Sequence, residues 1–105
     1  MKNCDKTCTC CERTKKIPRS ETTIKNLNDR LNRIIGQLGG IKTMLNENRY
    51  CGDVLIQLSA AQNALQNLGY EILKEHFKTC VADGLKNGDE EILDEAIHLI
   101  KKMNL

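Results

Sequence analysis

The sequence predicts an all-α protein with two long antiparallel helices and a short C-terminal helix. Apolar residues recur at alternating spacings of three and four along two segments, which is the pattern of helices packed lengthwise. Only 3% of the 105 residues are aromatic and Trp is absent, which argues against a β-sandwich. The single proline, Pro18, precedes both segments, so no proline interrupts either helix.

The first helix is expected to begin near residue 20. Ser20, Thr22 or Thr23 can cap it, and Glu21 suits the positive end of its dipole. The apolar seam that follows consists of Ile24, Leu27, Leu31, Ile34, Leu38, Ile41 and Leu45. NENRY, at 46–50, is interpreted as a turn.

Three glycines, Gly36, Gly39 and Gly40, lie within this first helix. Each weakens it by about 1 kcal/mol relative to alanine. We expect packing to offset that loss, because small residues let a neighbouring helix approach closely.

The second helix is expected from about residue 52 to 84, and KNGD, at 86–89, should end it. Its seam is Val54, Leu58, Ala61, Leu65, Leu68 and Ile72, extended by Leu55, Leu73 and Phe77. The short third helix carries Leu93, Ala96, Ile97, Ile100 and Met103. Three such helices cannot close a core around themselves. We therefore expect a dimer whose core is a four-helix bundle.

The bulk composition favours a cytoplasmic protein with reduced thiols. No apolar run approaches the roughly 20 residues needed to cross a bilayer, and MKNCDKTCTC lacks the apolar stretch of a signal peptide. In the cytoplasm, six cysteines favour metal binding or reactive-thiol chemistry over disulfides. Residues 1–50 carry 11 Lys or Arg and 5 Asp or Glu, whereas residues 51–105 carry 5 and 9. The basic half suits DNA, or is simply a solvated polar face.

The stretch EHFKTC places His76 and Cys80 four residues apart, so both side chains face one side of a helix. Cys51, the only other cysteine outside the N-terminal 19 residues, lies about 38 Å from His76 along the second helix. These three residues cannot meet within one chain, but they can meet between two antiparallel copies, giving two equivalent sites per dimer.

Two thiolates and one imidazole form a soft three-coordinate set that suits Cu(I), whereas Zn(II) would need a fourth ligand. The alternatives are that the His76–Cys80 spacing is coincidental and that Cys51 is a small buried apolar residue.

The stretches RLNRIIGQLGGIKTMLNENRYCGDVLIQLSAAQNAL and EHFKTCVADGLKNGD resemble the CsoR/RcnR family of bacterial metal-sensing repressors, specifically its copper-sensing CsoR branch. The resemblance covers roughly residues 24–103 and implies helical dimers that assemble into tetramers. It implies Cu(I) ligation by Cys51 of one protomer and by His76 and Cys80 of the other. Tyr50 and Glu95 match positions that hydrogen-bond around the histidine.

The resemblance also separates branches of the family. Nickel and cobalt sensors carry His where Cys80 stands, and formaldehyde and persulfide sensors lack the histidine at position 76. Cu(I) is therefore the implied signal, and Zn(II) can bind without acting as one.

The resemblance implies that metal-free protein docks a basic helical face on operator DNA, through phosphate contacts and DNA shape. Arg30 matches a DNA-contact position of the family. Arg33 is a second candidate, or a charge on the bundle surface. Asn67 replaces a basic contact residue of some relatives, and Ile35 replaces a charged one. Cu(I) would favour a tetramer shape that binds DNA poorly, which would derepress copper-export genes.

Residues 1–19 are polar and aperiodic, so we interpret them as a flexible tail preceding a helical domain at 20–105. The tail cysteines are Cys4, Cys8, Cys10 and Cys11. They can form a second metal site, capture incoming copper, or be an easily oxidised segment.

Two other functions stay open. A copper-buffering or carrier protein would bind metal without specific DNA affinity. A persulfide or redox sensor would use Cys51 and Cys80 and would tolerate loss of His76. An enzyme is not expected, because the sequence has no nucleophile–base–orienter set and no cofactor motif. His98 is interpreted as a surface or packing residue.

Overall fold

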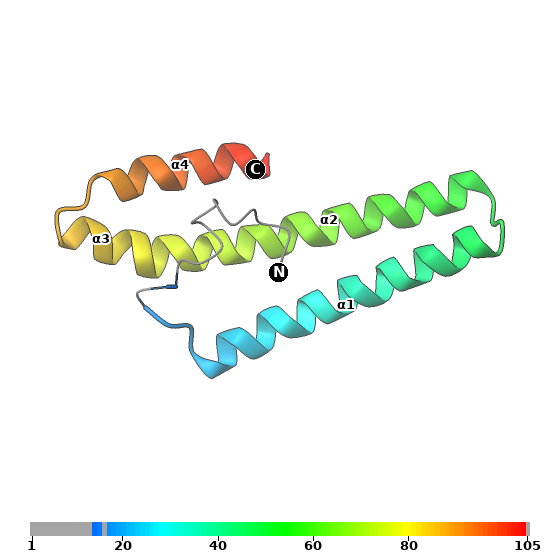
Figure 1. The fold of residues 1–105 in the computed structure, drawn as a ribbon, viewed down its shortest axis with the longest axis horizontal. Helices are drawn as coiled ribbons and strands as arrows, with labels where there is room; N and C mark the ends of the chain where they lie inside the picture. Colours follow the sequence, from blue (N-terminus) through cyan, green and yellow to red (C-terminus); the bar gives the residue numbers. More distant parts are fainter. Residues whose placement is uncertain (1–13, 16, 105) are drawn as a thin grey trace.

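The computed structural model describes residues 14, 15 and 17–104, and within these ranges all regular structure is helical. The elements are α1 (Glu21–Asn46), α2 (Cys51–His76), a π-helical turn (Phe77–Val81), α3 (Ala82–Lys86) and α4 (Glu91–Met103). α1 and α2 form an antiparallel hairpin, α3 continues α2, and α4 folds back along them (Figure 1). The predicted all-α fold, with two long helices and a short C-terminal one, is confirmed.

The ends of α1 follow from local sequence. Ser20 Oγ accepts a hydrogen bond from the backbone N–H of Thr23 at 3.1 Å, so Ser20 is the N-cap among the three candidates. After Asn46 the chain turns through Asn48, whose φ of 54° is left-handed. Asparagine tolerates that conformation at helix ends, and the turn predicted at 46–50 is confirmed.

α2, the π-helical turn and α3 form one continuous helical segment from Cys51 to Lys86, slightly longer than the predicted 52–84. Gly88, with a φ of 82°, lies in the connection that follows. The helical segment thus ends at KNGD, as predicted. The π-helical turn was not predicted. Such turns occur mostly as single insertions within α-helices, frequently at functional sites, and this one contains Cys80.

The core of the protomer is small and apolar. Its buried members among the described residues are Ile34, Ile41, Ala61, Leu68, Val81 and Ala96. The first four hold α1 against α2, and Val81 and Ala96 lie where α4 packs on the π-helical turn.

The glycines of α1 do not bring helices together within the protomer. A Cβ added at Gly36, Gly39 or Gly40 would meet nothing within 4 Å, so a close helix approach at these glycines stays a prediction for packing between protomers. Within the protomer, close approaches between helices lie at Gly69, against Met103, and at Gly84, where an added Cβ would be 2.9 Å from two carbon atoms of Ile92. Gly84 thus lets α4 pack tightly on α3.

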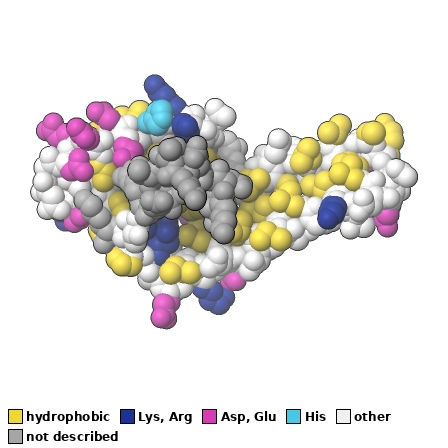
Figure 2. All heavy atoms as spheres, in the orientation of Figure 1, with side chains coloured by type: hydrophobic (Ala, Val, Ile, Leu, Met, Phe, Trp, Pro, Cys, Tyr) yellow, Lys and Arg dark blue, Asp and Glu magenta, His cyan; other side chains and the backbone are white. Residues whose placement is uncertain are grey.

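Much of both apolar seams stays exposed. The radius of gyration is 17.1 Å, whereas a compact domain of this length would have about 13 Å. Exposed seam residues are Ile24, Leu31, Leu38 and Leu45 on α1, and Leu55, Leu58, Leu65 and Ile72 on α2. Apolar side chains gather along the turn end of the α1–α2 hairpin (Figure 2). Apolar surface of this extent is typical of an association interface.

Candidate metal and DNA sites

The three predicted ligands lie at opposite ends of α2. Cys51 is its first residue and is exposed, His76 is its last, and Cys80 lies in the π-helical turn. Along a helix of 26 residues, the first and last residues are about 38 Å apart. Among the described residues of one protomer, no group of three or more His, Cys, Asp or Glu could hold a metal. One protomer therefore offers His76 and Cys80 at one end and Cys51 at the other.

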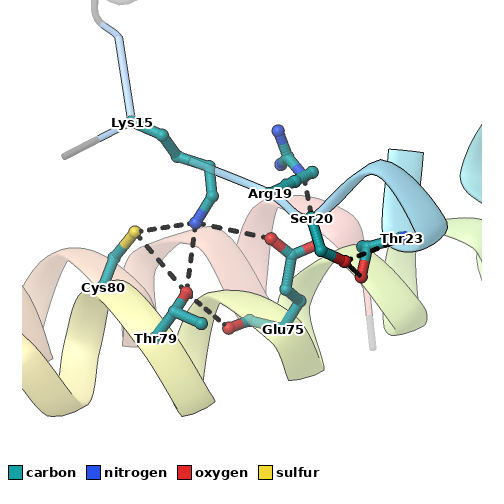
Figure 3. Close-up of polar contacts among 7 residues, drawn as sticks. All are labelled: Lys15, Arg19, Ser20, Thr23, Glu75, Thr79 and Cys80. Carbon is teal, nitrogen blue, oxygen red and sulfur yellow. Dashed lines mark hydrogen bonds and ion pairs between the residues drawn. The ribbon is translucent and has the colours of Figure 1, made fainter. Parts of the chain in front are cut away.

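Cys80 lies in a network of polar contacts (Figure 3). Lys15 Nζ donates hydrogen bonds to Cys80 Sγ at 3.0 Å and to Thr79 Oγ1 at 3.1 Å, and lies 3.4 Å from Glu75 Oε1. Arg19 Nε donates to the other carboxylate oxygen of Glu75 at 3.0 Å. Thr79 Oγ1 donates to the Glu75 carbonyl at 2.8 Å and lies 3.7 Å from Cys80 Sγ. The segment before α1 is thereby tied to the end of α2.

This network acts on the thiol of Cys80. Burial raises its pKa, but the hydrogen bonds from Lys15 and Thr79 and the charge of Lys15 lower it more, so the pKa lies below its ordinary value. The thiolate is the form of cysteine that binds metals and reacts as a nucleophile. The surroundings of Cys80 thus favour the metal-binding form.

The environment of His76 is also suited to a ligand. Its Nε2 atom is buried, and the adjoining π-helical turn packs against α4. Glu95 is half-buried on α4, next to the fully buried Ala96. Tyr50 caps α2 beside Cys51 and is 75% exposed. The predicted roles of Tyr50 and Glu95 around the histidine stay predictions.

A groove of about 660 Å³ runs between the first half of α1 and the end of α2. Arg30 and Arg33 line it together with Lys78, and the same two arginines line an adjoining hollow of about 230 Å³ that includes Asn67. Both arginines predicted to contact DNA therefore lie on one concave surface.

The groove holds more positive than negative charge. Each of its three carboxylates pairs with a cation: Asp29 with Lys25 at 2.8 Å, Glu71 with Lys74 at 3.7 Å, and Glu75 with Lys15 and Arg19 at 3.4 and 3.0 Å. Within the described part of the chain, Arg30, Arg33 and Lys78 form no ion pair. Lys78 was not among the residues that the sequence predicted for this surface.

The remaining sequence predictions concern the tail cysteines, His98, Ile35 and the domain boundary. Cys4, Cys8, Cys10 and Cys11 lie outside the described residues. His98 is exposed on α4, as expected, and Ile35 is 57% exposed. The domain boundary at residue 20 stays a prediction, although Lys15 and Arg19, on its N-terminal side, pair with Glu75 of α2. No helix in the described ranges is long and apolar enough to cross a membrane.

Comparison with known proteins decides the family. Residues 23–102 match the family model of the metal-sensitive transcriptional repressors. The protein belongs to this family. It is 43% identical over 77 residues to the copper-sensing transcriptional repressor CsoR of Bacillus subtilis, covering 72% of this chain and 76% of that one. It is 41% identical over 63 residues to the copper-sensing repressor RicR of Mycobacterium tuberculosis, covering 60% and 66%.

Two solved structures of metal-responsive regulators are also similar to this chain. A crystal structure of CsoR with Cu(I) from Geobacillus thermodenitrificans is 39% identical, with a TM-score of 0.81, covering 89% of this chain and 98% of that one. The nickel-responsive regulator InrS is 34% identical, with a TM-score of 0.68, covering 83% and 99%. The resemblance to the copper-sensing CsoR branch is thereby confirmed.

Proposed function

We propose that this protein is a Cu(I)-sensing transcriptional repressor of the cytoplasm. It binds operator DNA when metal-free and releases it when Cu(I) binds, which derepresses copper-export and resistance genes. The observation that carries this proposal is the placement of His76, at the end of α2, four residues before Cys80, in the π-helical turn, with a Cys80 thiol whose pKa is lowered. The similarity to repressors named as copper-sensing supports the choice of metal.

The Cu(I) site lies between protomers. Cys51 of one protomer joins His76 and Cys80 of the other, because the separation along α2 keeps them apart within one chain. Two soft sulfurs and one imidazole suit a low-coordinate Cu(I) ion, which when bound links the two chains. The exposed apolar seams support the antiparallel dimer that this site requires, and two dimers form the tetramer.

DNA binds at the groove through Arg30 and Arg33. Both guanidinium groups can approach phosphates, because neither forms a described ion pair and the carboxylates of the groove are paired with other cations. Contacts of this kind depend on charge and are weakened by salt.

The function is tested by anaerobic fluorescence anisotropy with DNA from the promoter of the protein's own gene. Cu(I) should weaken DNA binding by roughly 5- to 150-fold, the usual range of allosteric coupling. Cys51→Ala and His76→Ala should bind DNA without responding to Cu(I), whereas His98→Ala, a matched control on an exposed histidine, should respond normally. Tight Cu(I) binding without specific DNA affinity would instead indicate a buffering protein.

The lowered pKa of Cys80 also favours a thiol-based sensor. That function predicts that persulfide releases DNA from the wild type and that His76→Ala still responds to it. A Cu(I) response lost in His76→Ala, without a persulfide response in the wild type, excludes the thiol sensor.

The position of the site between protomers is tested by mixing variants. Neither Cys51→Ala nor His76→Ala alone should bind Cu(I) tightly. Refolded together at equal amounts, they should recover about one quarter of the wild-type stoichiometry, because half of the dimers are mixed and each has one intact site. No recovery, with mixed dimers verified by mass spectrometry, would refute a shared site.

A further inference from the structure

Lys78 lies on the side of the long helical segment that lines the groove. Glu71, Lys74 and Lys78 all line it and recur at spacings of three and four, which places them on one face of a helix. The side chain of Lys78 is exposed. Lys78 shares the π-helical turn with Cys80, but the two side chains are two residues apart and so face different sides of the helix. Lys78 therefore belongs to the groove.

The nearest carboxylate on this face does not hold Lys78. Glu75 is three residues earlier, a spacing at which a glutamate and a lysine usually pair on a helix. Both oxygens of Glu75 instead contact the segment before α1. Oε1 lies 3.4 Å from Lys15 Nζ, and Oε2 accepts a hydrogen bond from Arg19 Nε at 3.0 Å. Because those two cations neutralise Glu75, the ammonium group of Lys78 is left to the groove.

Lys74, a second lysine of the groove, differs from Lys78 in this respect. Its ammonium group lies 3.7 Å from Glu71 Oε1 and 5.8 Å from the centre of the Tyr70 ring. Among the described residues, Lys78 has neither an ion pair nor a ring contact. An anion can therefore bind Lys78 without breaking an ion pair, whereas binding at Lys74 would have to compete with Glu71.

Lys78 is too far from the two arginines to share a phosphate with them. Arg30 and Arg33 lie at the level of Ala64 and Asn67, with which they line the adjoining hollow. Lys78 is 11 residues beyond Asn67 on the same helical segment, or about 16 Å away. One phosphate cannot bridge that distance. A DNA duplex, however, carries a negative charge about every 1.7 Å along its axis, so a second phosphate is available.

We propose that Lys78 binds a DNA phosphate of its own, which extends the DNA-binding surface from Arg30 and Arg33 to the π-helical turn. This inference rests on the proposed function and adds a contact residue to its DNA surface. A phosphate contact adds affinity and fixes the position of the protein on the duplex, but it carries no sequence preference.

Two variants serve as references for Lys78→Gln. Arg30→Gln removes a cation already proposed to contact DNA. Lys42→Gln removes an exposed cation that does not line the groove. Lys42 is 12 residues from Arg30 along α1, or about 18 Å, which is more than the Debye length of about 10 Å at 0.1 M salt. Circular dichroism and native mass spectrometry verify the fold and the assembly of every variant.

The test measures the DNA affinity of metal-free protein by fluorescence anisotropy at several salt concentrations, with promoter DNA and with an unrelated duplex of equal length. For each protomer that contacts the duplex, Lys78→Gln should weaken binding by about five- to tenfold at about 0.1 M salt. It should also reduce the slope of log affinity against log salt by about 0.9 per contact. Both losses should appear with both duplexes. Lys78→Arg and Lys42→Gln should bind like the wild type.

A double variant tests whether the two contacts are separate. Lys78→Gln combined with Arg30→Gln should lose the product of the two single losses, because distant contacts are additive. A double variant no weaker than Arg30→Gln would overturn the separate phosphate, and a loss confined to promoter DNA would overturn a phosphate contact.

The failure of this inference differs from the failure of the proposed function. Wild-type affinity and salt slope in Lys78→Gln, while Arg30→Gln loses both, would overturn the inference and leave the proposed function standing. A wild type that does not bind promoter DNA would overturn the proposed function itself.

Discussion

Replacing Gly84 by alanine should destabilise the protein by forcing α3 and α4 apart. The added Cβ would lie 2.9 Å from both Cδ1 and Cγ2 of Ile92 and 3.4 Å from its Cβ, whereas carbon atoms normally pack at about 3.5–4.0 Å. Cγ2 is bonded directly to Cβ, so it moves away only if χ1 leaves the rotamer that a helix strongly prefers for isoleucine, or if α4 shifts. Overpacking of this kind costs about 1–3 kcal/mol.

Alanine also favours a helix over glycine by about 1 kcal/mol, so the net loss of unfolding free energy for Gly84→Ala should be about 0–2 kcal/mol. Gly36→Ala is the matched control. It has the same gain in helix propensity, but its Cβ meets nothing within 4 Å, so it should stabilise the protein by about 1 kcal/mol. The difference between the two variants, about 1–3 kcal/mol, isolates the cost of the clash.

The assay is urea unfolding followed by circular dichroism at one protein concentration, because association contributes to the stability. Adding Ile92→Ala removes the clashing carbons, so Gly84→Ala should become stabilising in that background. Equal unfolding free energies for Gly84→Ala and Gly36→Ala would refute the close packing of α3 on α4. Given the predicted role of Glu95 beside the histidine, a displaced α4 should also weaken Cu(I) binding.

Two further predictions concern the segment before α1. Half-maximal alkylation of Cys80 by iodoacetamide should occur at a lower pH in folded protein than in urea-unfolded protein, because the surroundings of Cys80 lower its pKa. Lys15→Met should raise the midpoint pH of the folded protein. Peptide mass spectrometry at each pH measures the alkylated fraction of Cys80. Coinciding folded and unfolded midpoints would contradict this. Ser20→Ala should cost about 1 kcal/mol of unfolding free energy through loss of the N-cap, and Ser20→Asp should restore it in urea unfolding; an alanine variant as stable as the wild type would mean that the cap contributes nothing.

The helices could be predicted because their seams have a strict period and their ends have recognisable residues. Ser20 caps α1 and Asn48 adopts a left-handed conformation in the turn. Serine is a preferred residue at helix N-caps, and asparagine tolerates the left-handed region. The separation of Cys51 from His76 followed from helix length alone. The family could be predicted from the two long stretches whose sequence resembles it, one ending at Leu65, within α2, and the other containing His76 and Cys80.

Other features leave no trace in the pattern of residue types. The π-helical turn is a shift in backbone hydrogen bonding that the seam around Phe77 does not reveal. Lys15 and Glu75 are 60 residues apart in the sequence, and long charged side chains follow no period that would pair them. The glycines of α1 meet no neighbouring helix within the protomer, because their number suggests close packing but does not say which helix they would approach.

The proposed antiparallel pairing of α2 with its copy has a consequence for how such proteins can change length during evolution. In the proposed dimer, the start of one α2 faces the end of its copy. The two-fold axis therefore passes between the two helices, at the level midway between Cys51 and His76. An insertion in α2 lengthens both copies equally and shifts that axis by half as much, so the ligands still face each other. The apolar seam remains in phase only if the insertion is about a whole heptad, and α1 must lengthen with it. Symmetry thus permits longer and shorter homologues with the same metal site, in steps set by the helical repeat.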